Sequence, residues 1–361
     1  MKFLHVVGAR PNFMKVAPVL AALAEHSGVE QLLVHTGQHY DANMSAIFFQ
    51  QLGIPEPDIN LEVGSGSHAV QTAQIMTKFE GVVLAQKPDM VLVYGDINST
   101  VAATLVCAKL QIPVSHVEAG LRSGDRTMPE EINRLVTDQI ADLLFTPSAD
   151  GDENLLREGI APQRIHFVGN VMIDTLVRLL PQAEALDIRR RLELTPQQYG
   201  LITLHRPSNV DEPARLYQIV ETLLTISREL PLVFPIHPRT RQRLADYPFG
   251  SQAGQIKFTE PLGYLEFLAL QRHARLIITD SGGIQEESTY LGIPCLTVRE
   301  NTERPVTVTL GTNQLVGQNM QKLRQATAMV LGGKAKQGTV PPLWDGQAGQ
   351  RVAQILTNGL Q

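Results

Sequence analysis

The chain has 361 residues, of which 43% are hydrophobic and 19% are charged, and its formal net charge is -5. This length exceeds what one hydrophobic core usually serves, so we expect two domains rather than one. The ordinary balance of residue types argues against a largely disordered chain, and the lack of a basic excess argues against a nucleic-acid partner.

Short apolar runs alternate with amphipathic stretches along the whole chain, which is typical of parallel sheets crossed by helices. In the first half, the predicted strands are Phe3 to Val7, Gln31 to Thr36, Met90 to Tyr94, Pro113 to Val117, Leu143 to Thr146 and Ile165 to Val168. After Asn170 the pattern restarts, with predicted strands at Leu201 to Leu204, Leu232 to Ile236, Ile256 to Thr259, Leu276 to Thr279 and Pro294 to Val298.

The restart predicts two Rossmann-like α/β domains, residues 1–169 and 170–345, joined by a short linker at Gly169 and Asn170. A last helix is predicted from Gln347 to Asn358, and we expect the terminal segment 346–361 to pack on the first domain.

The turn after the first strand carries two cations. Gly8 permits a tight turn, Pro11 can begin a helix, and Arg10 and Lys15 flank its amino end. A helix amino terminus with two cations predicts a pyrophosphate site. The alternative is a solvated loop with incidental cations, because helix starts usually prefer acidic side chains.

Carboxylates follow two later strands. Asp96 comes after the strand at Met90 and Glu118 after the strand at Pro113, so both are expected at one edge of the sheet. Glu130 and Glu131 add an acidic pair at a predicted helix start. The alternatives are a helix cap or structural hydrogen bond for the first two and favourable helix-end placement for the pair.

The second half offers two histidines and a small-residue turn. His205 and His237 each follow a strand, where a histidine can donate or transfer a proton, although either one can be merely structural. Ser281, Gly282 and Gly283 then form a turn whose bare amides could hold phosphate, and Glu287 could accept hydrogen bonds from ribose hydroxyls. The alternative for this segment is a plain tight turn.

Several motifs are missing from the sequence. It contains no G-x-G-x-x-G after the first strand, no G-x-x-x-x-G-K-[ST] and no H-E-x-x-H, which argues against dinucleotide, P-loop and zincin chemistry. Cys107 and Cys295 lack the spacing of a zinc site, so no metal is expected and a reducing compartment fits. With neither a signal-peptide pattern nor an apolar stretch of about 20 residues, we expect a cytoplasmic protein away from the membrane.

Together the motifs resemble those of the non-hydrolysing UDP-N-acetylglucosamine 2-epimerase family. The segments that carry the resemblance are GARPNFMK at 8–15, YGDINST at 94–100, HVEAGLRSGD at 116–125, PEEINR at 129–134, GN at 169–170 and DSGGIQEE at 280–287. The resemblance implies a glycosyltransferase-B-like fold in which the two domains face a cleft, a homodimer, no cofactor and a UDP-sugar substrate bound through domain 170–345.

The resemblance also implies a mechanism and site residues. UDP leaves by anti elimination to give 2-acetamidoglucal, and it then adds back with a proton delivered to the opposite face of carbon 2. The positions matching catalytic residues are Asp96, Glu118, Glu130, His205 and Lys15. Those matching substrate or UDP contacts are Arg10, Phe267, Ser281, Gly282, Gly283 and Glu287, with Arg134 and Arg304 as weaker matches. Which carboxylate removes the proton and which returns it stays open.

The sequence departs from the family pattern at several positions. Asn12-Phe13 and Pro207-Ser208 replace residues common in the family. Gln38, Arg206 and His237 match an allosteric substrate site found in some bacterial members, whereas Asp41 stands where Gln is typical and no Arg lies near Ser67, which argues against allosteric activation.

Three alternative functions share parts of this pattern. A hydrolysing 2-epimerase would release N-acetylmannosamine and UDP, and a retaining glycosyltransferase of the same fold would need an acceptor pocket. A nucleotide-sugar sensor would be expected to lose Asp96, Glu118 or Glu130, and all three are present.

Overall fold

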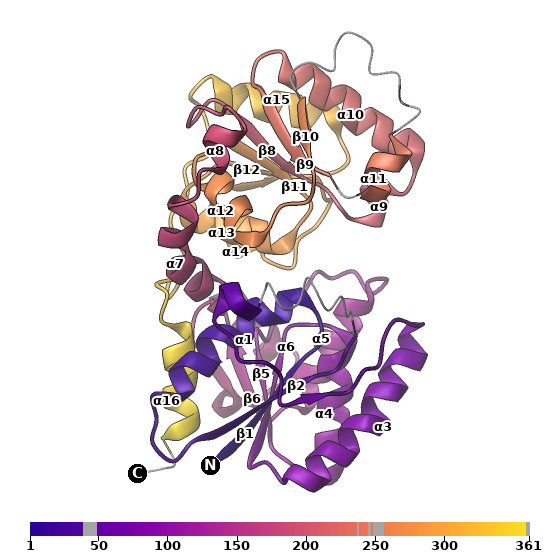
Figure 1. The fold of residues 1–361 in the computed structure, drawn as a ribbon, viewed down its shortest axis with the longest axis vertical. Helices are drawn as coiled ribbons and strands as arrows, with labels where there is room; N and C mark the ends of the chain where they lie inside the picture. Colours follow the sequence, from indigo (N-terminus) through magenta and orange to yellow (C-terminus); the bar gives the residue numbers. More distant parts are fainter. Residues whose placement is uncertain (39–48, 237, 245–246, 248–255, 359–361) are drawn as a thin grey trace. The chain divides into compact units, whose positions relative to one another are not determined.

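The computed structural model describes residues 1–38, 49–236, 238–244, 247 and 256–358. The chain forms two compact units, here called unit 1 (Met1–Arg178 with Pro342–Gln361) and unit 2 (Leu179–Pro341) (Figure 1). The border between the units, after Arg178, lies inside helix α7 (Val171–Glu184) and nine residues beyond Gly169 of the predicted linker. Helix α7 begins directly after that linker and continues across the border.

Unit 1 contains a parallel sheet of seven strands in the order β3-β2-β1-β4-β5-β6-β7. The strands are β1 (Lys2–Val7), β2 (Glu30–His35), β3 (Ile59–Asn60), β4 (Met90–Tyr94), β5 (Val114–Val117), β6 (Leu143–Thr146) and β7 (Ile165–Phe167). Its helices are α1 (Arg10–Leu23), α3 (His68–Gln86), α4 (Asn98–Leu110), α5 (Pro129–Ile140), α6 (Ala149–Arg157) and α16 (Ala348–Thr357), with a 3-10 turn η1 (Pro162–Arg164).

Unit 2 contains a parallel sheet of six strands in the order β10-β9-β8-β11-β12-β13. The strands are β8 (Gly200–Thr203), β9 (Leu232–Pro235), β10 (Ile256–Thr259), β11 (Leu276–Thr279), β12 (Cys295–Thr297) and β13 (Asn313–Leu315). The helices are α8 (Ile188–Arg191), α9 (Pro207–Val210), α10 (Pro213–Ser227), α11 (Pro238–Arg243), α12 (Tyr264–Arg272), α13 (Gly282–Leu291), α14 (Val306–Thr309) and α15 (Met320–Leu331).

The predicted fold class, two Rossmann-like parallel-sheet α/β domains, is confirmed. Central strands such as β4 are buried almost throughout, which explains why β4 reads as a continuous apolar run in the sequence. All eleven predicted strands are found within two residues at either end. The sequence analysis missed the short strands β3 and β13, whose residues lack an apolar run.

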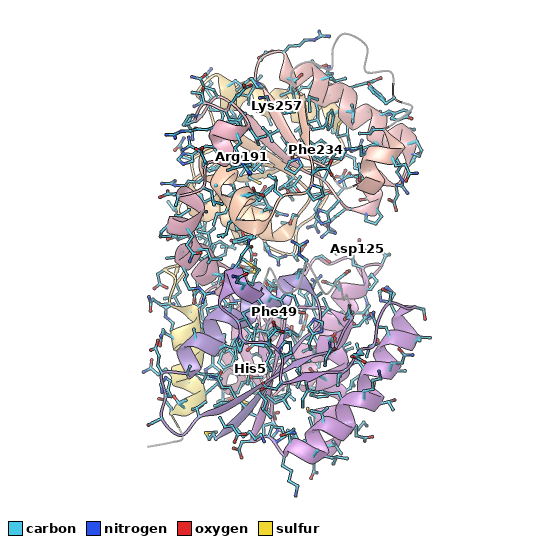
Figure 2. The ribbon with its side chains drawn as sticks, in the orientation of Figure 1. His5, Phe49, Asp125, Arg191, Phe234 and Lys257 are labelled. Atoms are coloured by element: carbon cyan, nitrogen blue, oxygen red, sulfur yellow. The ribbon has the colours of Figure 1, made fainter. Side chains whose placement is uncertain are left out.

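Each unit has its own interior. His5 lies inside unit 1 and Phe234 inside unit 2 (Figure 2). His5 Nδ1 lies 2.6 Å from the Tyr94 hydroxyl, and burial lowers the pKa of His5 to about 3. The imidazole is therefore neutral at neutral pH and belongs to the core.

The C-terminal segment is held in unit 1. Helix α16 lies beside α1, and the Asp174 carboxylate of α7 accepts hydrogen bonds from the amides of Ala348 (3.1 Å) and Gly349 (2.7 Å) (Figure 1). These amides open α16 and have no partner within their own helix, so Asp174 caps it from a distant part of the chain. Trp344 Nε1 also donates to the Pro147 carbonyl at 2.8 Å.

Candidate active site

The strand orders place the predicted residues at the two points where ligands bind in open parallel sheets. In unit 1 the order reverses between β1 and β4, and in unit 2 between β8 and β11. Crevices open beyond the carboxyl ends of the strands at such reversals. Arg10 and Asp96 follow the first pair of strands, and His205 and Ser281 follow the second pair.

In unit 1, Lys15 and Glu118 form a buried ion pair. The Lys15 ammonium, on α1, donates to Glu118 Oε2, and the two side chains are 6% and 2% exposed. Gly95 lies against this pair, with φ of +63°, and a Cβ atom there would stand 2.5 Å from Lys15 Nζ. The turn after β4 therefore needs glycine for both its conformation and its space.

Glu118 itself has an unusual backbone. Its φ is 76°, in the left-handed region that non-glycine residues rarely occupy. Its amide and that of Ala119 both donate to the Phe145 carbonyl, at 3.1 and 3.0 Å. Strain of this kind persists where neighbouring bonds fix the chain, and it is concentrated at functional sites.

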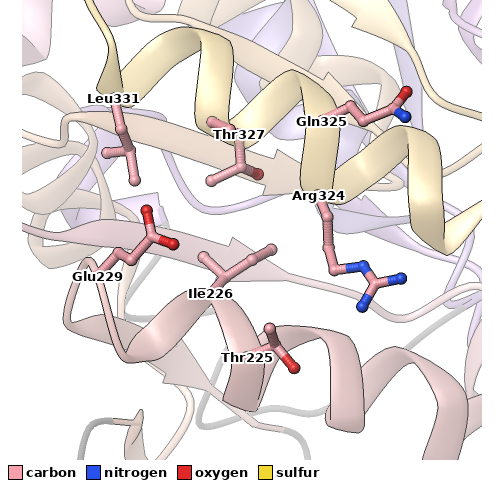
Figure 3. A pocket seen from close by; sticks show the side chains of 8 residues that line it. Thr225, Ile226, Glu229, Arg324, Gln325, Thr327 and Leu331 are labelled. Atoms are coloured by element: carbon pink, nitrogen blue, oxygen red, sulfur yellow. The ribbon is translucent and has the colours of Figure 1, made fainter.

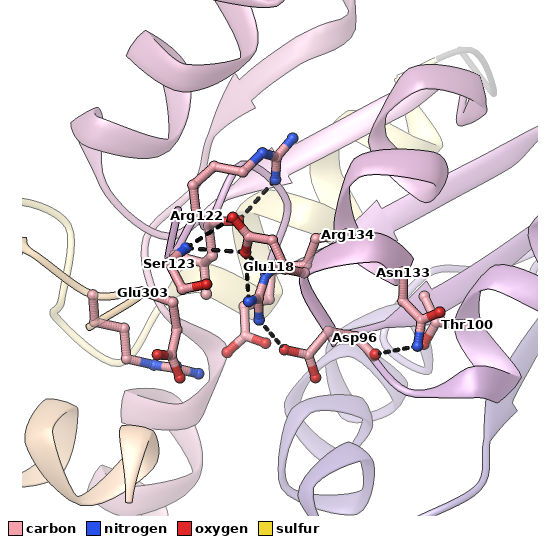
Figure 4. A network of polar contacts seen from close by, with 12 residues as sticks. Asp96, Thr100, Glu118, Arg122, Ser123, Asn133, Arg134 and Glu303 are labelled. Carbon is pink, nitrogen blue, oxygen red and sulfur yellow. Dashed lines mark hydrogen bonds and ion pairs between the residues drawn. The ribbon is translucent and has the colours of Figure 1, made fainter. Parts of the chain in front are cut away.

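Asp96 lies beside Arg134 rather than capping a helix. The Arg134 guanidinium donates to the Asp96 carboxylate and, with Nη2 at 2.6 Å, to Glu131, while Asn133 donates to the Asp96 carbonyl at 2.9 Å (Figure 4). Arg134 is 2% exposed, and the Asp96 side chain is 23% exposed. Asp96 is thus a partly accessible carboxylate held by a buried cation.

The acidic pair at the start of α5 divides between two environments. Glu130 is exposed, whereas Glu131 is buried and accepts from Arg134 and from the amides of Ser123 and Gly124. Burial would raise the pKa of Glu131, but the Ser123 amide and Arg134 outweigh it and hold the pKa below its ordinary value. Glu131 therefore fixes the loop and Arg134, and Glu130 remains available to a ligand.

The turn after β1 begins a helix, as the sequence predicts. Pro11 lies in the first turn of α1, and Asn12 Oδ1 accepts from the amides of Gly8 and Ala9, each at 3.2 Å. Asn12 Nδ2 donates to the Tyr94 carbonyl at 2.7 Å. Asn12 thus joins the turns after β1 and β4, while Arg10 is exposed at the helix start.

In unit 2, Asp280 holds the segment that carries His205. This fully buried carboxylate accepts from the amides of His205 and Arg206 and from Asn209 Nδ2, and His205 Nδ1 lies 3.1 Å away. Burial would raise the pKa of Asp280, but the hydrogen bond and charge of His205 and the bond from Asn209 lower it. The carboxylate fixes Nδ1 as the donor, so Nε2 is the free nitrogen of a side chain that is 59% exposed.

The Ser281–Gly283 turn has the predicted strand-to-helix form. Asp280 and then Ser281 follow β11, and Gly282 and Gly283 open α13. A Cβ on Gly282 would lie 2.5 Å from Arg304 Nη1, so a cation stands against the bare amides. Arg304 pairs with Glu286 at 2.9 Å and with Glu303 at 2.6 Å, which sets its guanidinium in place. Such a helix start beside a cation suits an anionic ligand.

Glu287 is buried one turn inside α13. It accepts a hydrogen bond from the Tyr264 hydroxyl at 3.0 Å, and burial, opposed by that bond and assisted by the charge of Glu286, raises the pKa of Glu287 to about 7. Phe267 lies on α12 with Tyr264 and is half-buried. Glu287 is therefore poised between its two protonation states at neutral pH.

Two of the three residues that match an allosteric substrate site lie among the described residues. Gln38 is buried in unit 1, where its Oε1 accepts from the Ser99 amide at 3.0 Å and hydroxyl at 2.8 Å. Arg206 is half-buried in unit 2, and its Nε donates to the Asp280 carbonyl at 3.1 Å. His237 lies outside the described residues.

The sequence analysis missed the polar residues that hold the site. Asp280 could have been found, because it follows β11 directly. The sequence of helix α5 also indicates residues that support the site. Glu131, Arg134 and Asp138 are spaced so that they lie on one face of the helix. That face is the buried one, and its charged residues serve the site rather than an apolar core.

One pocket of the structure lies away from the predicted site residues. A pocket of about 270 Å³ lies between α10 and α15 and is lined by residues including Ile226, Glu229, Arg324 and Leu331 (Figure 3). It contains none of the predicted site residues.

In the part of the chain that the structure describes, no helix is long and apolar enough to span a bilayer, and no group of three or more His, Cys, Asp or Glu could hold a metal ion.

Comparison with known proteins gives concordant matches over nearly the whole chain. The family model for UDP-N-acetylglucosamine 2-epimerase matches residues 21–357. A UDP-N-acetylglucosamine 2-epimerase of Methanocaldococcus jannaschii is 45% identical over 367 residues, covering 99% of this chain and 100% of the relative. A UDP-2,3-diacetamido-2,3-dideoxy-D-glucuronate 2-epimerase of Pseudomonas aeruginosa is 42% identical over 360 residues, covering 99% of each protein.

A solved structure has the same fold. The crystal structure of Methanocaldococcus jannaschii UDP-GlcNAc 2-epimerase in complex with UDP-GlcNAc and UDP matches with a TM-score of 0.89 and 44% identity, covering 99% of this chain and 100% of that chain.

Proposed function

Because the chain belongs to the UDP-N-acetylglucosamine 2-epimerase family and is therefore a nucleotide-sugar epimerase, we propose that it interconverts UDP-N-acetylglucosamine and UDP-N-acetylmannosamine. The observation that carries the proposal is the match over residues 21–357 together with carboxylates that follow β4 and β5 in unit 1.

The proposed reaction has two steps. A base removes the proton from carbon 2, the bond between carbon 1 and the UDP oxygen breaks with its electron pair leaving on UDP, and a double bond forms between carbons 1 and 2. UDP then attacks carbon 1 of this 2-acetamidoglucal, and an acid delivers a proton to the opposite face of carbon 2. Elimination and addition balance without an oxidant or reductant, so the proposed reaction needs no redox cofactor.

We assign the sugar chemistry to Asp96, Glu118 and Glu130. A carbon-bound proton is weakly acidic, so its removal must be coupled to UDP departure and to stabilisation of developing positive charge at carbon 1. Asp96 and Glu118 follow neighbouring strands of the unit 1 sheet, and each is held in position by a buried cation, Arg134 or Lys15. Glu130 adds an exposed carboxylate at the start of α5.

We assign the diphosphate and uridine to other groups. Arg10 and the α13 start at Ser281, Gly282 and Gly283 would bind phosphate oxygens, and Glu287 and Phe267 would contact the nucleoside. His205, oriented by Asp280, would protonate or hydrogen-bond the departing UDP through Nε2.

Incubation in heavy water tests the proposal. We expect protein treated with chelator and free of nicotinamide to convert UDP-N-acetylglucosamine into UDP-N-acetylmannosamine carrying deuterium at carbon 2. Free N-acetylmannosamine with UDP would instead identify the hydrolysing reaction, and inversion without deuterium would refute loss and return of the proton.

A second substrate deserves the same assay. The Pseudomonas aeruginosa relative, named for a UDP-2,3-diacetamido-glucuronate, is almost as similar (42%) as the Methanocaldococcus jannaschii relative (45%). Comparison of kcat/KM for the two UDP-sugars decides between them. The homodimer that the family resemblance implies stays a prediction, which sedimentation would test.

A further inference from the structure

We infer that Asp138 is a positioning residue for the reaction, because it fixes the strained turn that presents Glu118. This inference rests on the proposed function, in which Glu118 is catalytic. Asp138 lies on α5 and acts through three neighbours of Glu118 along the chain.

Asp138 binds the chain on both sides of Glu118. Its Oδ1 lies 2.6 Å from His116 Nδ1, two residues before Glu118, and its Oδ2 accepts from the Gly120 amide at 3.1 Å, two residues after it. Arg122 Nη1 donates to the same Oδ2 at 2.7 Å. One carboxylate thus spans the segment from β5 to the following loop.

His116 carries this restraint to the neighbouring turn. Its Nε2 lies 2.8 Å from the Gly95 carbonyl, so the two ring nitrogens of His116 join Asp138 to the turn after β4. Gly95 is the residue against which Lys15 and Glu118 pack. Asp138 and His116 together therefore link the turn of Glu118 to the turn that precedes Asp96.

The carboxylate is ionised and completely enclosed. Asp138 and His116 have fully buried side chains, and the Arg122 side chain is 10% exposed. Burial would raise the pKa of Asp138, but the charges and hydrogen bonds of His116 and Arg122 hold it below its ordinary value. Arg122 is fixed in turn by Glu158, which accepts from Nε at 2.8 Å and Nη2 at 2.7 Å.

The need for such a restraint follows from the backbone of Glu118. A left-handed φ of 76° at a non-glycine residue is strained and persists only where the surroundings enforce it. Without Asp138, Gly120 and Arg122 would lose their shared acceptor, and the turn could relax. Glu118 would then leave its place beside Lys15.

Asp142 provides a matched control. It follows α5, and its Oδ2 accepts from the Val114 amide at 2.8 Å, so it anchors the same strand β5 at the opposite end from Glu118. Asp142→Asn tests loss of a carboxylate that holds β5, without touching the turn of Glu118.

The experiment compares the full-length wild type with Asp138→Asn and Asp142→Asn. For each protein we would measure kcat and KM for UDP-N-acetylglucosamine, UDP affinity by calorimetry, and amide hydrogen exchange of residues 116–122. We expect Asp138→Asn to lower kcat about 100-fold, as displacement of a catalytic group by about 1 Å does. UDP affinity should be unchanged, exchange at Gly120 should be faster, and Asp142→Asn should keep its kcat.

Arg122→Gln is the milder second variant if Asp138→Asn does not fold. It removes one of the three donors and should lower kcat in the same direction by a smaller factor. Equal loss of kcat in Asp138→Asn and Asp142→Asn, or an unchanged kcat despite faster exchange at Gly120, would overturn the inference. A wild-type protein that fails to epimerise in heavy water would refute the proposed function itself, which separates the two failures.

Discussion

The Lys15 ammonium is buried against the Glu118 carboxylate, although the two residues are 103 positions apart in the chain. One side chain comes from α1 and the other from the turn after β5, so the pair joins the two elements at the carboxyl edge of the unit 1 sheet. Stability and the proposed chemistry therefore depend on the same contact.

Lys15→Met should destabilise the protein and abolish turnover. Removing one partner leaves a buried, uncompensated carboxylate, which costs about 3–5 kcal/mol of unfolding free energy. Lys2→Met is the control, since the Lys2–Glu30 pair (3.2 Å) has side chains 23% and 62% exposed. An exposed pair of this kind contributes about 0–1 kcal/mol. Urea unfolding of both variants checks the difference, and equal losses would contradict it.

Asp96→Asn and Ser281→Ala should have opposite effects. Asp96 is assigned to the sugar and Ser281 to the phosphates, so the first substitution should lower kcat by about 100-fold or more while UDP affinity holds. Ser281→Ala should weaken UDP binding with a smaller effect on kcat. Steady-state kinetics and calorimetry with UDP measure the two quantities, and similar losses of both in each variant would refute the assignment.

Gly95→Ala should lower both stability and turnover. The new methyl group would meet Lys15 Nζ at 2.5 Å and Glu118 Oε2 at 3.2 Å, and the φ of +63° is itself unfavourable for alanine. Gly28→Ala isolates the backbone effect, because Gly28 has φ of +80° and nothing within 4 Å of its would-be Cβ. We expect the Gly28 variant to lose about 1 kcal/mol and to keep its kcat. Full activity in the Gly95 variant would contradict the close packing.

The affinity for uridine should rise with pH through about 7. The pKa of Glu287 is raised to about 7, so below this pH the carboxyl is protonated and has lost part of its capacity to accept from ribose hydroxyls. From pH 8 to pH 6 the ionised fraction falls about tenfold, which sets the largest expected loss of affinity. Uridine is the ligand because it carries no phosphate that titrates in this range.

Glu287→Gln is the control for that measurement. It should remove the pH dependence while keeping an acceptor oxygen. The raised pKa of Glu287 also affects the free energy of unfolding. The protonated carboxyl contributes its full stabilisation below the ordinary carboxyl pKa, and this contribution is lost as pH rises through about 7. Wild-type uridine affinity that is flat between pH 6 and pH 8 would show that Glu287 does not contact the ribose.

The local pattern of residue types along the chain predicted much of the fold and part of the candidate site. Mainly apolar runs identified most of the strands, because parallel strands covered on both faces are largely apolar. Residues in the turns after those strands, such as Asp96 and Ser281, could be selected because ligands bind at that edge. Only the tertiary structure shows the order of the strands in each sheet, and therefore which strands lie at the point where that order reverses.

Helix α5 shows where local pattern fails. Its charged residues Glu131, Arg134 and Asp138 face inward, while Ile132 is 38% exposed. Hydrophobicity alone would assign the buried face of this helix wrongly, because buried charges are tolerated when partners from other elements satisfy them. Those partners, which include Asp96 and His116, lie on different strands and turns.

The sequence by itself thus determined the two parallel-sheet domains and the carboxylates and small-residue turn that follow their strands, since both depend on residue type and spacing along the chain. Only the tertiary structure decided that Lys15 neutralises Glu118, that Asp280 orients His205 and that Asp138 clamps the turn of Glu118. Ion pairs and hydrogen bonds depend on separations in space, and residues that folding brings within hydrogen-bonding distance carry no mark of one another in the sequence.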